Sequence, residues 1–262
     1  MTILTFKINA KTMLQHVTAA GYAINTREKN ATISLRCKDS TIIVEGFCAD
    51  FSVSTPVLSG ADCQDFVWGV DYKTLLNLCK YAKKEEIVFT LNTESVTLSA
   101  YVGGNAFDIR VEGYQKFYER KVDSVALSHC FASNVKDSSD LINAIDSVSY
   151  AAARKDIRKH LCGVNLKSKD GGVKICATDG YRLAERTLLN VTPLLDFNVT
   201  LHNSIIDLLL KQAKKASIAL DIYANGIVVI AYDSTRIIVD TPEIGKFPDI
   251  ERVKQPWQIA RQ

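Results

Sequence analysis

The sequence predicts an α+β fold in which one structural unit occurs twice. Each half reads as strand, helix, strands, helix and strands. The halves overlie each other with an offset of 131 residues, half of 262, which places segment 73–84 over segment 204–215. Chance similarity of two amphipathic helices is the alternative, and the matched order of all elements argues against it. We therefore expect two domains, each with two helices on mostly antiparallel sheet.

In the first half, residues 1–9 alternate in polarity and predict a strand. Asn9 is placed to cap a helix over 10–24, where Met13 and Val17 begin an apolar stripe at helical spacing. A second helix over 71–84 starts at Asp71. Further strands are predicted at 31–37, 41–48, 50–57, 65–70, 86–92, 95–101 and 106–111.

In the second half the pattern restarts after a charged, aromatic connector at 112–122. Helices are predicted over 138–153 and 203–215, with His202 flanking the latter. Strands are predicted at 123–130, 161–168, 172–177, 182–189, 197–201, 217–223, 226–232 and 234–240. The domain boundaries follow as 1–118, 119–253 and a tail at 254–262.

Composition is that of an ordinary globular protein, with 47% hydrophobic and 23% charged residues. No apolar run approaches the roughly 20 residues of a membrane span, and the N-terminus has no signal-peptide pattern. Seven cysteines occur singly, without a C-x-x-C pair, which favours a reducing cytoplasm over a disulfide framework or a zinc site.

Lysines recur at equivalent places on the repeated helices, namely Lys73, Lys80, Lys83 and Lys84 on the first and Lys211, Lys214 and Lys215 on the second. One interpretation is a solvated face, with the last lysines favoured by the helix dipole. The other is a surface for a phosphate backbone, which binds by charge and reads no sequence. Neither helix shows i±4 glutamates to neutralise the lysines, and the recurrence supports the phosphate interpretation.

No catalytic motif appears in the sequence. The four histidines are scattered, and nucleophile-elbow, P-loop and dinucleotide-binding patterns are absent. Clustered carboxylates for magnesium are also absent. We therefore expect a non-enzymatic protein without metal or cofactor.

The stretch Ala177–Ala184 contains Asp179-Gly180 between two apolar runs, which predicts a hairpin turn. An exposed Tyr181 and Arg182 at such a corner would form a small binding surface. A plain turn without a binding role is the alternative, because turns far outnumber sites.

Three segments carry a resemblance to a known family. They are Ile145–Ser149 with Asp156–Val164, then Ala177–Ala184, then Gly245–Val253. Together they resemble the second domain of the bacterial sliding clamp, the β subunit of DNA polymerase III. The family shows A-T-D-G-H-R-L-A where this chain has A-T-D-G-Y-R-L-A, so Tyr181 replaces the usual histidine. The first half is similar only in pattern.

The resemblance implies a DNA sliding clamp, a polymerase processivity factor that encircles duplex DNA. Bacterial β clamps have three such domains per chain and close six domains into a ring as dimers. This chain stops just past the second domain, so we expect a head-to-tail homotrimer. A shortened clamp of bacterial type further suggests a phage-encoded protein in the bacterial cytoplasm.

The same resemblance implies which side chains face DNA and which bind partners. The DNA-facing residues are expected to be Lys11, Arg27, Lys73, Lys80, Lys83, Lys84, Arg154, Lys155, Arg158, Lys211, Lys214 and Lys215. The pocket for short peptides of polymerase and clamp loader is expected to use His160, Leu161, Thr178, Gly180, Tyr181, Arg182, Leu183 and Pro256. In three-domain clamps the third domain completes this pocket. Here the tail 254–262 either rebuilds the wall, occupies the groove or is a frayed terminus.

Two other hypotheses stay open. One is a clamp-like decoy that binds host replication proteins without closing a ring. The other is an unrelated monomeric enzyme whose site is assembled from distant residues.

Overall fold

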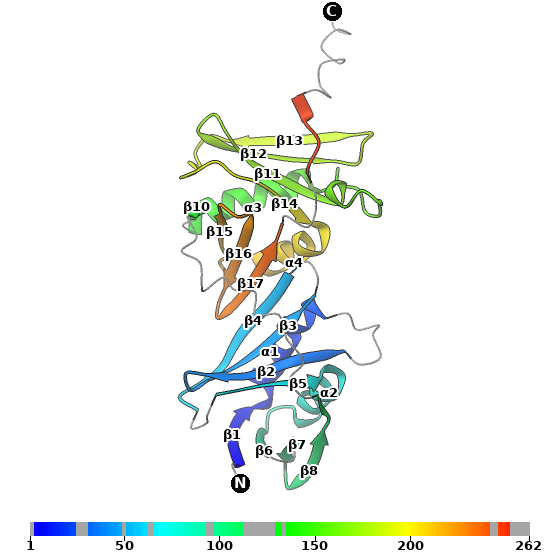
Figure 1. Ribbon diagram of the computed structural model, residues 1–262, viewed down its shortest axis with the longest axis vertical. Coiled ribbons are helices and arrows are strands. Elements are labelled where there is room, and N and C mark those ends of the chain that lie inside the picture. The colour runs from blue at the N-terminus through cyan, green and yellow to red at the C-terminus, as the bar shows by residue number, and fades with distance from the viewer. Residues whose placement is uncertain are drawn as a thin grey trace, which may run out of the picture. The chain divides into compact units, whose positions relative to one another are not determined.

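The computed structural model describes residues 3–24, 31–48, 51–61, 65–92, 97–112, 129–132, 135–241 and 246–251 (Figure 1). Helices and antiparallel strands confirm the predicted α+β class. Residue contacts divide the chain into two compact units, Met1–Ala126 with Val229–Val239, and Leu127–Val228 with Asp240–Gln262. The domain boundaries at 118/119 and 253/254 remain a prediction.

The first half of the chain contains two helices, one four-stranded sheet and five strands of a nine-stranded sheet. The helices are α1 (Ala10–Ala20), which passes into a 3-10 turn at Gly21–Ala23, and α2 (Tyr72–Ala82). One sheet has the order β1-β6-β7-β8, and another part of the fold has the order β4-β3-β2-β5-β9. Their bounds are β1 (Ile3–Asn9), β2 (Thr32–Lys38), β3 (Thr41–Phe47), β4 (Phe51–Ser59), β5 (Phe66–Asp71), β6 (Glu86–Asn92), β7 (Thr97–Val102), β8 (Asn105–Ile109) and β9 (Val111–Glu112).

The second half repeats this order. Its helices are α3 (Val135–Ser149) and α4 (Asn203–Ala213), with a 3-10 turn at Lys159–Leu161. Strand order is β13-β12-β11-β14 in a four-stranded sheet, whereas β10-β15-β16-β17 continues through the pairing of β17 with β4 into β4-β3-β2-β5-β9 as one nine-stranded sheet. Their bounds are β10 (His129–Ala132), β11 (Gly163–Lys169), β12 (Gly172–Thr178), β13 (Leu183–Leu188), β14 (Asn198–His202), β15 (Ala219–Tyr223), β16 (Ile227–Tyr232) and β17 (Thr235–Asp240).

Strand register confirms the repeat at the predicted offset. The pairs Thr32↔Asp71 and Phe47↔Ser52 of the first half recur 131 residues later as Gly163↔His202 and Thr178↔Leu183. Order β4-β3-β2-β5 therefore corresponds to β13-β12-β11-β14, and β1-β6-β7-β8 to β10-β15-β16-β17. A one-residue slip would turn every apolar side chain to the wrong face, so such agreement reflects a real duplication.

Side-chain caps fix where the helices begin. The Asn9 side chain accepts a hydrogen bond from the Lys11 amide, and that of Asp71 accepts one from the Thr74 amide. His202 caps α4 through Nδ1, which accepts from the Ser204 amide. All three confirm the starts predicted from sequence.

A few expectations differ from the structure. The helix predicted over 10–24 ends at Ala20, and the 3-10 turn at Gly21–Ala23 follows it. The single strand predicted over 106–111 is two strands in the structure, β8 and β9, and β9 pairs with β5. The strand predicted over 123–130 lies mostly outside the described residues, as does most of the connector 112–122.

Candidate functional site

The Asp-Gly turn is the corner of a hairpin, as predicted. Strands β12 and β13 pair antiparallel up to Thr178↔Leu183. Gly180 adopts a φ of 94°, in the region that favours glycine. Tyr181 next to it is 97% exposed. The loop thus presents an aromatic side chain to solvent at the end of a rigid hairpin.

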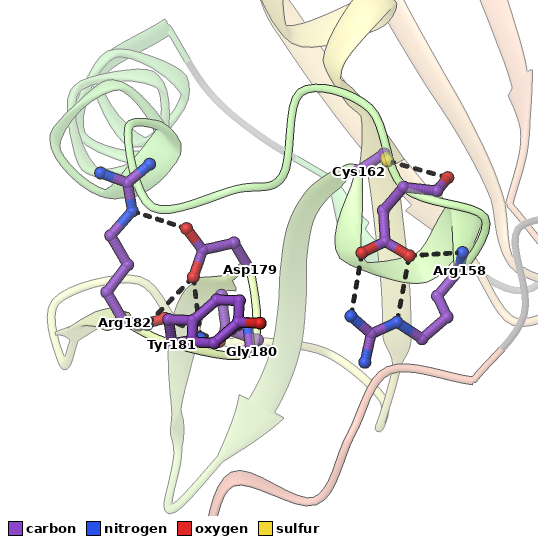
Figure 2. Close-up of polar contacts among 8 residues, drawn as sticks. Arg158, Cys162, Asp179, Gly180, Tyr181 and Arg182 are labelled. Carbon is purple, nitrogen blue, oxygen red and sulfur yellow. Dashed lines mark hydrogen bonds and ion pairs between the residues drawn. The ribbon is translucent and has the colours of Figure 1, made fainter.

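Hydrogen bonds within the corner hold its shape (Figure 2). Asp179 Oδ1 accepts from the amides of Tyr181 and Arg182, both at 3.0 Å, and Oδ2 lies 2.9 Å from Arg182 Nε. The Thr178 hydroxyl donates to the Arg182 carbonyl and accepts from the Gly180 amide. The bonds to Asp179, first that of the Arg182 amide and then that of Tyr181, keep the pKa of this carboxyl below its usual value.

Two arginines flank the corner. Arg182 Cζ lies 5.9 Å from the centroid of the Tyr150 ring. Arg158 is ion-paired with Asp156 at 2.9 Å, and this bond lowers the pKa of Asp156 to about 2. A Cβ at Gly180 would stand 3.7 Å from an Arg158 guanidinium nitrogen. The structure therefore brings Arg158, which was expected to face DNA, to the predicted peptide pocket.

His160 and Leu161 lie in the 3-10 turn that precedes β11. Leu161 is 2% exposed, so its side chain belongs to the core, whereas His160 is half-buried. The amide of Ala153 donates to the Leu161 carbonyl, which ties this turn to the end of α3.

The last described segment, residues 246–251, packs onto the same hairpin. Phe247 and Ile250 form an apolar cluster with Cys176, and Leu183 packs against it. A hollow of about 470 Å³ is lined by this cluster and by neighbouring lysines. Two segments that resemble the clamp family, 177–184 and 245–253, therefore meet at Leu183.

An ion-pair network fastens this segment to the sheet. Lys174 Nζ lies 2.6 Å from a Glu251 oxygen and 3.2 Å from Glu185, and its side chain is only 11% exposed. Lys169 adds a third contact at 3.1 Å from Glu251. Burial alone lowers the pKa of Lys174, but the hydrogen bonds with Glu251 and Glu185 outweigh burial and raise it. The bond from Lys174, followed by that from Lys169, lowers the pKa of Glu251 to about 2.

Sequence reasoning missed this network. Lys174 lies within an apolar strand and comes near Glu185 only because β12 pairs with β13. Its other partner, Glu251, lies 77 residues away in the sequence. Tyr150 was missed for the same reason. The single sequence signal was the charged residue inside the apolar run 172–177.

The lysines of α2 and α4 are all exposed, as predicted, while Leu75, Leu78 and Cys79 of α2 face the core. Lys83 and Lys84 follow the end of α2, and Lys214 and Lys215 follow the end of α4, where the helix dipole favours cations. Within the described part of the chain, no carboxylate pairs with these four residues or with Lys73 and Lys80.

The charge on α4 is partly compensated. Asp207 stands four residues before Lys211 and lies 3.4 Å from Arg154. The helix therefore carries an aspartate at the i−4 position, where the sequence analysis considered only glutamates. Lys11 and Lys155 are exposed. Arg27 and Pro256 lie outside the described residues, together with the tail.

Other kinds of site find no support in the described ranges. No group of three or more His, Cys, Asp and Glu side chains is arranged there to hold a metal ion. None of the described helices has the length and apolar character needed to cross a membrane.

Comparison with known proteins points to one family. Residues 136–249 match the family described as the central domain of the DNA polymerase III beta subunit. The beta sliding clamp of Pseudomonas aeruginosa is 27% identical over 189 residues, 70% of this chain and 49% of that protein. The chain therefore spans about half the length of this curated relative.

Solved structures agree in fold. A Helicobacter pylori beta clamp bound to a DNA ligase peptide has a TM-score of 0.80 at 13% identity, covering 95% of this chain and 69% of that one. The DNA polymerase III subunit beta of Pseudomonas aeruginosa has a TM-score of 0.79 at 20% identity, with 95% and 68% covered. The griselimycin-bound clamp of the same organism has a TM-score of 0.78 at 19% identity, with 96% and 68% covered.

Each repeat has two helices on antiparallel strands, and the likeness to these structures places the fold in the DNA-clamp class. Within the DNA-clamp class, the sequence match of the second repeat indicates the bacterial type of clamp. Residues 136–249 match the central domain of the bacterial DNA polymerase III β subunit, and the chain as a whole is similar to the β sliding clamps.

Proposed function

We propose that this protein is a sliding clamp that encircles duplex DNA and tethers a DNA polymerase to it. The observation that carries the proposal is the duplicated clamp fold, whose second repeat matches the β-subunit central domain over residues 136–249. The role needs no chemistry from the chain, hence no catalytic residue, metal or cofactor. A clamp of this kind acts in the cytoplasm of a bacterium.

The DNA-facing surface in this proposal is made by the exposed lysines of the two repeated helices. Lys73 and Lys80 on α2, with Lys214 and Lys215 after α4, have no carboxylate partner among the described residues, so their charge is available to phosphates. Arg154 and Arg158 contribute less, because Asp207 and Asp156 hold them. Lys11, Lys155 and Arg27 complete the proposed set. Lysine suits loose contact with a sliding duplex better than a bidentate arginine does.

The partner pocket in this proposal is the corner at Tyr181. Tyr181, Arg182 and Leu183 are held by the Asp179 turn, and the segment 246–251 supplies an apolar wall at Leu183. His160, Thr178, Gly180 and Pro256 complete the proposed lining, while the buried Leu161 supports it from below. Short peptides of polymerase and clamp loader are the expected ligands. The DNA ligase peptide on the Helicobacter pylori clamp supports this class of ligand.

Three chains are needed to close the ring if six domains make a full turn, which gives a head-to-tail homotrimer. Retention on DNA is then topological, so each lysine contact can be weak and screened by salt.

The test is mass photometry of the protein alone and with nicked circular DNA, after loading or after assembly at high protein concentration. We expect a species near three times 29.0 kDa that stays on circles and slides off the same DNA once it is linearised. Equal loss from circular and linear DNA at high salt would contradict encirclement. A stable monomer that captures host clamp or polymerase would instead favour the decoy, for which the comparisons give no support.

A further inference from the structure

One face of the sheet β13-β12-β11-β14 is polar. Side chains of β11 alternate between the two faces, so the buried Val164 and Leu166 lie on one face and Asn165 and Lys167 lie on the other. Strand pairing places Lys174 opposite Lys167, which puts both lysines on the face of Asn165. We call this face, with its lysines and asparagines, the polar face. It is separate from the exposed lysines of α2 and α4.

The polar face carries a pair of like charges on neighbouring strands. Lysines directly opposite each other destabilise a sheet, and Lys167 and Lys174 form such a pair, with Lys169 two residues further along β11. Glu251 neutralises Lys174 and Lys169, at distances of 2.6 and 3.1 Å. In the described part of the chain no carboxylate pairs with Lys167. The Lys167 ammonium is therefore available to an anion from another molecule.

The hollow of about 470 Å³ beside the segment 246–251 is lined by this face. Phe247, Pro248 and Ile250 supply apolar lining, and Asn165 and Asn198 supply amide groups. The charged lining residues are four lysines and two carboxylates, namely Lys167, Lys169, Lys174, Lys246, Asp249 and Glu251. The described lining thus carries more positive than negative charge, which favours an anionic ligand.

A second hollow, of about 340 Å³, adjoins the first. It shares Asn198, Lys246 and Phe247 with the larger hollow and continues to Asn225 and Thr241. Lys246 is exposed, and no carboxylate among the described residues pairs with it. Two adjoining hollows suit an extended ligand better than a single inorganic ion.

The buried amide of Asn165 indicates a ligand that has N–H groups. Asn165 is 5% exposed, and its Nδ2 lies within hydrogen-bond distance of three acceptors. They are Asn198 Oδ1 at 2.8 Å, the Val199 carbonyl at 3.0 Å and the Thr200 hydroxyl at 3.1 Å. These contacts fix the orientation of the amide, and its Oδ1 accepts no hydrogen bond from the described residues. A peptide backbone supplies a donor for such an acceptor, whereas an ionised carboxylate or sulfate does not.

We propose that the two hollows bind an extended, acidic peptide of a partner protein. Its carboxylates pair with the ammonium groups of Lys167 and Lys246, and an apolar side chain lies against the half-buried Pro248. A backbone N–H of the peptide donates to Asn165 Oδ1. This site is distinct from the Tyr181 corner, and its binding requires neither duplex DNA nor a closed ring.

Fluorescence anisotropy tests the site with a defined probe, a labelled hexapeptide of alternating glutamate and leucine. We expect it to bind the wild-type chain, and to bind about tenfold or more weakly to Lys167→Ala with Lys246→Ala, which loses two charge-assisted contacts. The matched control, Lys7→Ala with Lys38→Ala, removes the same charge from exposed positions outside the hollows and should bind like wild type. Lys167→Arg with Lys246→Arg keeps the charge and should keep most of the binding.

Two further probes identify the class of ligand. The corresponding peptide of glutamine and leucine should bind about tenfold or more weakly, because it has no carboxylates. A labelled oligothymidylate should also bind more weakly than the acidic peptide. If it binds more tightly and loses its affinity in Lys167→Ala with Lys246→Ala, the site is one for nucleic acid and the proposal is wrong.

The remaining outcomes are equally decisive. No binding of the acidic peptide to wild type, equal binding of the glutamine peptide, or an equal loss in the control variant overturns the proposal. Loss of binding in Tyr181→Ala but not in Lys167→Ala with Lys246→Ala assigns the peptide to the Tyr181 corner and also overturns it. None of these results bears on the clamp function, which is tested by retention on circular DNA.

Discussion

At the scale of single residues, the corner depends on charges that the fold brings together. Lys174 and Glu251 lie 77 residues apart in sequence and 2.6 Å apart in the structure, and through them the segment 246–251 is fastened beside Leu183. Since the Lys174 ammonium is largely buried, it requires its carboxylate partners. The wall of the proposed pocket therefore depends on an ion pair as much as on Phe247 and Ile250.

This ion pair predicts a pH dependence of stability. The pKa of Glu251 falls from 4.5 in the unfolded chain to about 2 in the fold, so its stabilisation is complete above about pH 4.5 and is lost as pH falls through about 2. Glu251→Gln should be less stable than wild type at pH 7, and the difference should shrink between pH 4.5 and 2. Urea unfolding at several pH values measures this difference.

The matched control is Glu86→Gln, an exposed glutamate at the start of β6. It should leave the pH profile of stability close to that of wild type. A constant difference between Glu251→Gln and wild type across this pH range would show that Glu251 acts through packing rather than charge.

At the scale of elements, side-chain caps and register decide where each helix and strand begins. Asn9, Asp71 and His202 each accept a hydrogen bond from an amide in the first turn of a helix, and two of these caps occupy equivalent positions in the repeat. A cap at a fixed place in the sequence sets which face of the helix meets the sheet. The lysines of α2 and α4 are therefore on corresponding faces because their caps correspond.

Removing the cap of α2 should lower stability by a predictable amount. Asp71→Ala leaves the Thr74 amide without its 2.7 Å partner and should cost about 1 kcal/mol of unfolding free energy. Asp71→Asn keeps an acceptor at the same place and should lose only a small part of that. Chemical denaturation of both variants checks the expectation, which fails if they are equally destabilised.

At the scale of the whole molecule, the repeated lysines fit the clamp function proposed above. Exposed positive charge that binds weakly is useful on a ring that is retained by topology, because tight contacts would slow its movement. In the proposed function, retention therefore depends on assembly, and a single chain is expected to bind DNA only through salt-sensitive contacts.

Charge reversal separates the contribution of the lysines to DNA contact from the assembly of the oligomer. Changing Lys80, Lys83, Lys211 and Lys214 to Glu should abolish clamp-stimulated DNA synthesis while the mass of the oligomer stays the same, since all four side chains are exposed and none belongs to the core. The control reverses two exposed lysines elsewhere, Lys7 and Lys38, and is compared with reversal of Lys80 and Lys211 alone, for an equal change of net charge. Processivity assays measure the DNA synthesis supported by each variant, and mass photometry measures the size of its oligomer. Unchanged processivity in the first variant would remove these lysines from the DNA-facing surface.

The sequence by itself determined the class of fold, the repeat at 131 residues, nearly every strand and helix, and the hairpin at Asp179-Gly180. These features follow from local patterns, namely period-2 and period-3.6 hydrophobicity, capping residues and turn chemistry. The lysine stripes were found for the same reason. Only the bounds moved by a few residues, as at α1, where the 3-10 turn replaces the last helical turn.

The tertiary structure alone decided which distant residues meet. Lys174 with Glu251, Arg182 with Tyr150, and Arg158 beside Gly180 are contacts across strands and loops, and no local pattern encodes them. The pairing of β17 with β4 belongs to the same class, since hydrogen bonds between backbones leave no mark on side-chain sequence. The Tyr181 corner was visible as a turn in sequence, and the structure gave it a neighbouring wall.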